Sequence, residues 1–212
     1  MPILKEKNKE RGITLIEIVV VIFIIGMFSM IMVNDFPKII RQFAISRAAY
    51  KLAQDIRRTE DLGLSGVQIA TISGEDVQAK GYGVYIDISS ESTNKQYIIY
   101  ADKGSAPNQQ YDGNGQYCDN LSDDQLDCIV ELINVNKQEP GIYIKEIHFS
   151  DNAESGVVAS INFKPPNPDI KIRNMESPDV YQSNIDIVFG SDNNSSMIRT
   201  VSINRSGLVE VE

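Results

Sequence analysis

The chain has 212 residues, of which 42% are apolar and 23% charged, a composition that is ordinary for a globular protein. The formal net charge is −9; residues 1–12 carry a net +2, so the remainder of the chain carries −11. A body this acidic repels a phosphate backbone, which argues against nucleic acid as a ligand. The length predicts one domain, or one domain with an appendage.

The first predicted element is an apolar segment behind a short charged leader. Among the 21 residues 13–33, only Thr14, Glu17 and Ser29 are polar. As a helix this segment is roughly 30 Å long, about the thickness of one bilayer core. It is too long for the apolar region of a signal peptide, so we expect a membrane span with the leader in the cytoplasm. A carboxylate inside a span is costly, which makes Glu17 a candidate functional residue.

A second helical segment is predicted over residues 35–66. Apolar residues recur there at spacings of three and four, which indicates an amphipathic helix packed on a globular head. Gly63 and Gly66 provide two stop signals. The predicted apolar stripe consists of Ile39, Ile40, Phe43, Ala49, Tyr50, Ala53 and Ile56. The polar side consists of Lys38, Arg41, Arg47, Lys51, Asp55, Arg57 and Arg58, with Arg57 and Arg58 on a solvated face.

From residue 67 onward the hydrophobic period changes to two, which predicts a β-rich head over residues 67–212. No helical period and no fixed repeat is visible in this part of the sequence. Two hairpins are expected, one from residues 81–88 and 95–100, the other from 184–189 and 197–204 with a polar tip at 190–195. The further predicted strands are residues 68–73, 129–135, 142–149, 157–163 and 208–211.

The start of the apolar run resembles the cleavage and methylation motif of type IV pilins and pseudopilins, since it reads Arg11-Gly12-Ile13-Thr14-Leu15-Ile16-Glu17. The resemblance implies that prepilin peptidase cuts between Gly12 and Ile13 and that Ile13 becomes the methylated first residue. It also implies that Glu17 pairs with the N-terminal amine of a neighbouring subunit during assembly. A buried carboxylate needs such a partner.

A helical stem followed by an all-β head is the pilin architecture, an α+β fold with a long N-terminal helix packed on an antiparallel β-sheet head. Within that family the chain is most similar to GspH/FimT-type minor pilins. The similar segments are residues 52–58, 81–84 and 198–209. The expected organisation is a cleaved cytoplasmic leader at 1–12, a transmembrane and assembly helix at 13–34, a stem at 35–66 and a head at 67–212, with an insertion at about 104–128.

The resemblance implies a non-enzymatic subunit without a cofactor, anchored once in the cytoplasmic (inner) membrane with its head outside. Its partners would be prepilin peptidase and other pilin or pseudopilin subunits. The assembly would be a type IV pilus, a type II secretion pseudopilus or a DNA-uptake filament, in the periplasm or outside the cell. A tip binding module or adhesin, or a major pilin, are the alternatives. His148, the only histidine, lies in a predicted strand and belongs to no catalytic motif.

The only two cysteines, Cys118 and Cys128, enclose nine residues. Outside the cytoplasmic membrane they are expected to form a disulfide, which would stabilise the fold by about 2–3 kcal/mol. Two free thiols or a metal site are the alternatives, although no histidine lies nearby to complete a zinc site.

Part of the same stretch approaches the spacing of a calcium loop. Weak candidate ligands are Asp112, Asn114 and Asp123. Tyr117 stands where such a loop needs its sharp-turn glycine, and no glutamate closes it. An exposed polar turn is therefore the favoured interpretation.

Overall fold

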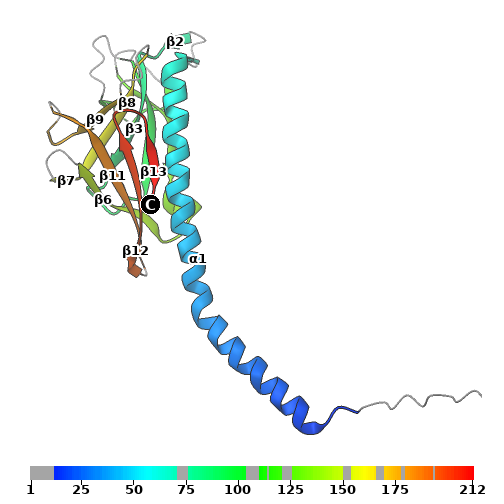
Figure 1. Cartoon of the computed structure of the whole chain (residues 1–212). Helices are drawn as coiled ribbons and strands as arrows, with labels where there is room; N and C mark the ends of the chain where they lie inside the picture. The colour runs from blue at the N-terminus through cyan, green and yellow to red at the C-terminus, as the bar shows by residue number, and fades with distance from the viewer. Residues whose placement is uncertain are drawn as a thin grey trace, which may run out of the picture. The chain divides into compact units, whose positions relative to one another are not determined.

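The computed structural model describes residues 12–70, 76–103, 110–113, 115–120, 126–149, 154–165, 170–177, 180–192 and 194–212. One long helix, α1 (Leu15–Ser65), is followed by antiparallel β-sheets (Figure 1). This confirms the expected α+β, pilin-like architecture. The chain divides into two compact units, Met1–Arg41 and Gln42–Glu212.

The first unit contains the apolar turns of α1. The helix begins at Leu15 and stays helical through Pro37. It is long and apolar enough to cross a membrane, and none of its most apolar window is buried within the protein. Apolar side chains without protein cover are what a membrane span presents to lipid.

The second unit begins with the remaining turns of α1, which end at Ser65. Gly66 follows with φ +59°, a left-handed conformation that terminates a helix at little cost for glycine. This confirms the second predicted stop signal. The face of α1 that is buried in the head consists of Ala44, Ile45, Ala48, Ala49, Leu52, Ala53 and Ile56.

The predicted apolar stripe was therefore wrong in part. Ala49, Ala53 and Ile56 are buried, but the four bulkier members are between 46% and 61% exposed, namely Ile39, Ile40, Phe43 and Tyr50. The buried face is rich in alanine, whose small side chain lets a helix approach a sheet closely and pack at high density. Asp55, expected on the polar side, is also buried.

Two antiparallel sheets make up most of the head. The six-stranded sheet has the order β10-β9-β8-β3-β4-β5, with β3 (Gly81–Asp87), β4 (Gln96–Asp102), β5 (Cys128–Asn134), β8 (Val158–Phe163), β9 (Ile170–Asn174) and β10 (Tyr181–Gln182). The five-stranded sheet has the order β13-β12-β11-β6-β7, with β6 (Ile142–Phe149), β7 (Glu154–Gly156), β11 (Asn184–Ser191), β12 (Asn194–Asn204) and β13 (Val209–Val211). A small third sheet pairs β1 (Gln68–Ala70) with β2 (Asp76–Gln78).

Most of the strand predictions are confirmed, including both hairpins, β3–β4 and β11–β12. The polar tip of the second hairpin is shorter than expected, because Ser191 already pairs with Asn194. The sequence patterns missed β2, β7, β9 and β10, which have two to five residues each. The expectation of no further helix was wrong at α2 (Val135–Gln138), a single turn that the Asn134 side chain caps.

The core lies between the two sheets and α1. Buried side chains of all three form one continuous hydrophobic cluster. Two consecutive arginines of α1 contact opposite sheets: Arg57 Nη2 donates to the Val209 carbonyl oxygen of β13 at 3.1 Å, and Arg58 Nη1 pairs with Glu131 of β5 at 2.7 Å. Both strands are sheet edges, so the helix covers the two edges that would otherwise leave the core open.

Part of the predicted insertion lies over the opposite face of the six-stranded sheet. The ring of Tyr111 lies 4.9 Å from that of Tyr85 on β3 and 5.2 Å from that of Tyr100 on β4. Gln110 accepts a hydrogen bond from Arg173 of β9. This face is therefore covered by chain rather than by solvent, which explains why Tyr100, Ser160 and Asn162 are buried there.

Candidate assembly site

The N-terminal motif forms the start of α1. Gly12, Ile13 and Thr14 precede the helix and are exposed. The Glu17 carboxylate Oε2 lies 3.4 Å from the Thr14 backbone nitrogen and 3.3 Å from the Thr14 hydroxyl group. This is half of a capping box, in which an acidic side chain in the first turn accepts from the residue before the helix. The acidic group is also favourable at the positive end of the helix dipole.

Thr14 is thus a member of the site that the sequence analysis did not assign. The sequence does contain a helix-start pattern that includes Thr14. In this pattern a Thr is followed three residues later by a Glu, ahead of an apolar run. Among the described residues only Thr14 donates to Glu17, and it does so to Oε2 alone. The second carboxylate oxygen remains available as an acceptor.

The peptide bond between Gly12 and Ile13 lies in non-helical, exposed chain. Apart from its chain neighbours, no described residue lies within 4 Å of the position that a Cβ atom on Gly12 would occupy. Gly12, Ile13 and Glu17 thus lie together within one helical turn of the point where α1 begins. The leader segment 1–11 lies outside the described residues.

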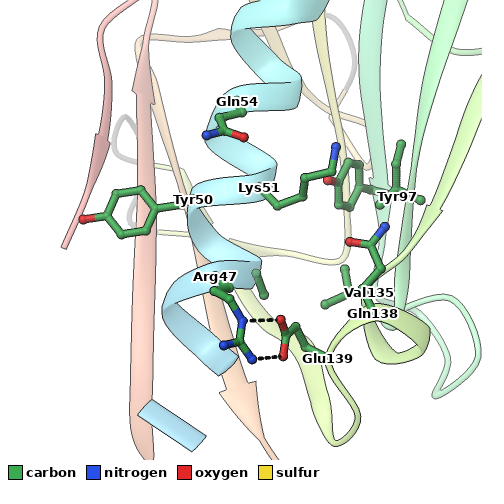
Figure 2. Close-up of a pocket in the computed structure, with 10 residues that line it drawn as sticks. Arg47, Tyr50, Lys51, Gln54, Tyr97, Val135, Gln138 and Glu139 are labelled. Carbon is green, nitrogen blue, oxygen red and sulfur yellow. Dashed lines mark hydrogen bonds and ion pairs between the residues drawn. The ribbon is translucent and has the colours of Figure 1, made fainter. Parts of the chain in front are cut away.

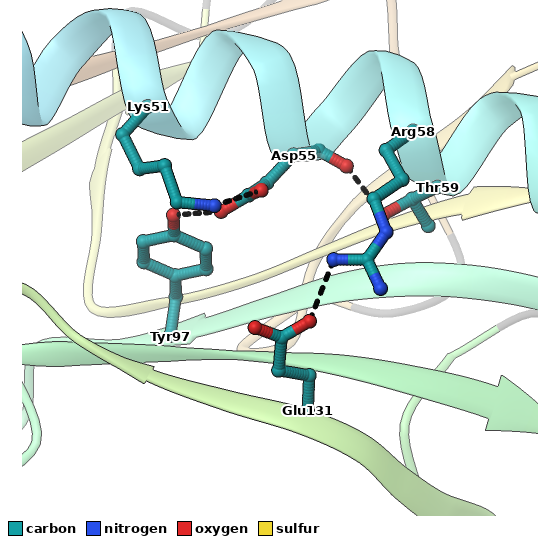
Figure 3. A network of polar contacts seen from close by, with 6 residues as sticks. All are labelled: Lys51, Asp55, Arg58, Thr59, Tyr97 and Glu131. Atoms are coloured by element: carbon teal, nitrogen blue, oxygen red, sulfur yellow. Dashed lines mark hydrogen bonds and ion pairs between the residues drawn. The ribbon is translucent and has the colours of Figure 1, made fainter.

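A buried polar network joins the stem to the head (Figure 3). The Tyr97 hydroxyl group of β4 donates to Asp55 Oδ2, and Lys51 Nζ donates to Asp55 Oδ1, both at 2.5 Å. Burial raises the pKa of Tyr97, and its hydrogen bond to Asp55 raises it further, so the phenol stays protonated and donates. One turn later, Thr59 donates its hydroxyl hydrogen to the Asp55 carbonyl oxygen.

A groove of about 370 Å³ opens beside this network, between α1 and the β5–α2 segment. Figure 2 shows the Arg47 guanidinium facing Glu139 across the opening, in a two-point ion pair at 2.5 and 2.8 Å. Arg47, one of the cations predicted for the polar side of the stem, therefore binds a carboxylate of the head. Arg58, expected on a solvated face, does the same through Glu131.

Cys118 and Cys128 form a disulfide in the structure. Both cysteines are buried, and they form a second, smaller hydrophobic cluster with Tyr82 and Ala101, against which Leu62 packs. The disulfide joins η1 (Cys118–Asn120) to the first residue of β5. It therefore fastens the end of the insertion to an edge strand.

The weak calcium candidates are only partly described. Asp112 is exposed, and its backbone nitrogen donates to Asp127 Oδ2 at 3.1 Å. Asn114 and Asp123 lie outside the described residues. In the part of the chain that the structure describes, no group of three His, Cys, Asp or Glu side chains is arranged to hold a metal ion.

His148 lies on β6, as predicted, with 43% of its side chain exposed. Its Nε2 lies 3.1 Å from Glu146 Oε2, and its Nδ1 lies 3.3 Å from the Ser155 hydroxyl oxygen. The pKa of Glu146 is lowered, first by its hydrogen bond to Lys145 and then by the one to His148. These contacts lie on the surface of the sheet, so His148 is a surface residue.

Comparison with known proteins adds one finding. Residues 7–33 match the protein-family model for the prokaryotic N-terminal methylation motif. The motif indicates a type IV pilin or pseudopilin. The match includes Gly12, Ile13 and Glu17 and implies processing by prepilin peptidase and assembly with other pilins. Together with the apolar helix, it fits a pilin anchored in the inner membrane. No curated protein and no solved structure matches the chain.

Proposed function

We propose that the chain is a minor pilin or pseudopilin of the GspH/FimT type, a non-enzymatic subunit of a filament. Prepilin peptidase cleaves it between Gly12 and Ile13, and the new N-terminal amine of Ile13 is methylated. The observation that carries this proposal is the order of features at the N-terminus. An exposed Gly12–Ile13 bond is followed directly by the Thr14–Glu17 cap and by a helix of membrane-spanning length.

Glu17 has two roles in this proposal. In the single subunit it caps the start of α1 through Thr14. In the assembled filament its free carboxylate oxygen accepts from the Ile13 amine of a neighbouring subunit, because a charge within packed apolar helices needs an opposite charge. That pairing fixes how far one helix is staggered along the next.

The GspH/FimT assignment is supported by the strands that carry the similar segments. Residues 81–84 lie in β3, and residues 198–209 run through β12, the Gly207 turn and the start of β13. The filament is a type IV pilus, a type II secretion pseudopilus or a DNA-uptake filament. Outside the leader the chain carries −11, which weighs against direct contact of the head with DNA.

The assembly role is tested with Glu17→Gln and Glu17→Ala. Glutamine in the first turn still accepts from the residue before the helix but carries no charge, so Glu17→Gln keeps the cap and removes the ion pair. We expect both variants to insert into the membrane and to be depleted strongly from sheared filaments. Asp35→Asn, an exposed carboxylate change on the same helix, is the matched control and should assemble normally. Normal assembly of Glu17→Gln would contradict the pairing role.

A further inference from the structure

Three polar side chains on the surface of the five-stranded sheet form a hydrogen-bonded series. The Ser155 hydroxyl oxygen lies 3.3 Å from His148 Nδ1, and His148 Nε2 lies 3.1 Å from Glu146 Oε2. A hydroxyl group, a base and a carboxylate in this order are the arrangement that activates a serine as a nucleophile. We propose that Ser155 is a covalent modification site, at which His148 activates the hydroxyl group for acylation by esters with a good leaving group.

The register of two strands places the three side chains on one face of the sheet. His148 of β6 is directly opposite Ser155 of β7, and residues that are opposite each other in an antiparallel pair project to the same face. Glu146 lies two positions before His148 on β6, and side chains alternate between faces along a strand. The series is therefore held by the backbone of two paired strands.

The charge of Glu146 decides where the protons of this series lie. Its Oε1 binds Lys145 Nζ at 2.9 Å, and its hydrogen bonds to Lys145 and then to His148 lower the pKa of Glu146. An ionised carboxylate only accepts hydrogen bonds, so Nε2 of His148 carries the hydrogen. In the neutral imidazole Nδ1 is then the acceptor, and the Ser155 hydroxyl group donates to it. This is the direction of proton transfer that attack by Ser155 requires.

A second carboxylate lies on the same face, on the neighbouring strand. Asp186 of β11 is opposite His148 on the side away from β7. The negative charges of Asp186 and Glu146 favour the imidazolium cation that forms when His148 takes the proton. The surroundings of His148 therefore favour its role as a base.

Ser155 is accessible to a modifying reagent. Its side chain is exposed, and β7 is the edge of the sheet opposite to β13, the edge that Arg57 of α1 contacts (Figure 1). An exposed sheet surface does not enclose a substrate, so one acyl transfer to Ser155 is expected rather than repeated turnover. The inference is compatible with a non-enzymatic subunit and does not depend on assembly into a filament.

The acylation step is balanced without an oxidant or a reductant. Ser155 Oγ attacks the carbonyl carbon of the ester while its proton passes to His148 Nδ1. The bond between the carbonyl carbon and the leaving oxygen breaks, and the leaving alkoxide takes the proton from His148. The products are an acyl ester on Ser155 and a free alcohol.

The ester p-nitrophenyl acetate tests this reactivity on the full chain in detergent. The reaction is stopped with acid, and peptide mass spectrometry measures acetyl esters on individual serines. Ser206 is the internal control, because it is also exposed but donates its hydroxyl hydrogen to Asn204 Oδ1. We expect the initial rate of acetylation at Ser155 to exceed that at Ser206 by about tenfold or more, which is below the usual contribution of a general base because the site is open to solvent.

Substitutions separate activation from a structural role. His148→Gln keeps a side chain that forms hydrogen bonds but is not a base, so it should lower the rate at Ser155 to that at Ser206. Glu146→Gln should lower the rate severalfold, and Glu146→Asp, which keeps the charge, should retain more of it. Equal rates at Ser155 and Ser206 in the wild type would overturn the proposal. So would an unchanged rate at Ser155 in His148→Gln together with a lower melting temperature, the result expected if the contact only stabilises β7.

Discussion

The hydroxyl group of Tyr97 donates a hydrogen bond to the carboxylate of Asp55, 42 residues away in the sequence and on a different element. Both residues are buried, at the place where the stem helix meets β4. A carboxylate in such a place is stable only when donors surround it, and Lys51 supplies the second one. The pair therefore fixes which face of α1 lies on the sheet.

Tyr97→Phe tests this relationship. The substitution keeps the ring and removes the donor, which leaves one carboxylate oxygen of Asp55 buried without it, so we expect a loss of about 1–3 kcal/mol in the free energy of unfolding. The measurement is denaturant unfolding of the detergent-solubilised chain. Tyr50→Phe is the control, because Tyr50 lies on the same stretch of α1 as Asp55 but is exposed. Equal stability of both variants would show that the Tyr97 hydrogen bond contributes nothing.

The sequence predicted the long helix, its end at Gly66 and the longer strands, because these depend on local periods and on glycine. It predicted only part of the stripe of the stem that is buried. Phe43 and Tyr50 are apolar and exposed, whereas Asp55 is charged and buried. That choice depends on Tyr97 and on the edges of two sheets, which come together only in the folded chain. The short strands β9 and β10 were missed because their hydrophobic patterns are too brief.

At the candidate assembly site, the motif predicts Gly12, Ile13 and Glu17, and the capping contact of Thr14 could have been predicted from the same residues. The covering of the six-stranded sheet by Tyr111 was not predictable. It depends on contacts with Tyr85 and Tyr100, which are distant in the sequence.

Asp127 gives the head a pH dependence. It is buried, and its two oxygens accept from the backbone nitrogens of Lys103 and Asp112, at 3.1 Å each. Burial raises the pKa of Asp127 most, and the charge of Asp102 raises it further, from 3.8 to about 7. The two hydrogen bonds lower the pKa but do not outweigh these effects. In the unfolded chain the carboxyl ionises near 3.8, while in the folded chain it stays protonated until about pH 7. Its contribution to stability is therefore greatest below about pH 4 and is lost as the pH rises through about 7.

Melting temperatures measured between pH 4 and 8 test this contribution. We compare the free energy of unfolding of the wild-type chain with that of Asp127→Asn. Relative to the variant, the wild type should be more stable at pH 4 than at pH 8, by on the order of 2–4 kcal/mol. Asp119→Asn, an exposed carboxylate change next to the disulfide, should leave the pH profile unchanged. Parallel profiles for the wild type and Asp127→Asn would rule out the buried carboxyl as the cause.

Gly83 is required by the ring of Tyr100. It pairs with Tyr100 on one side and with Asn162 on the other, and the Tyr100 hydroxyl group contacts both Ser160 and Asn162. The ring therefore passes over Gly83, and a Cβ atom there would lie 2.4 Å from Tyr100 Cζ. We expect Gly83→Ala to destabilise the head by about 1–3 kcal/mol in denaturant unfolding. Gly26→Ala, with nothing within 4 Å, should not destabilise the head, and equal effects of the two changes would contradict the close contact.

The central claim is that the chain is a processed pilin-like subunit, and N-terminal mass spectrometry tests it most directly. The protein is produced at full length in cells that contain a prepilin peptidase and is purified from their membranes. The account predicts a mature chain that begins at Ile13 and carries one methyl group on its α-amine, and it predicts that substitution of Gly12 by a bulky residue abolishes both changes. An intact N-terminus at Met1 in those cells would contradict the account.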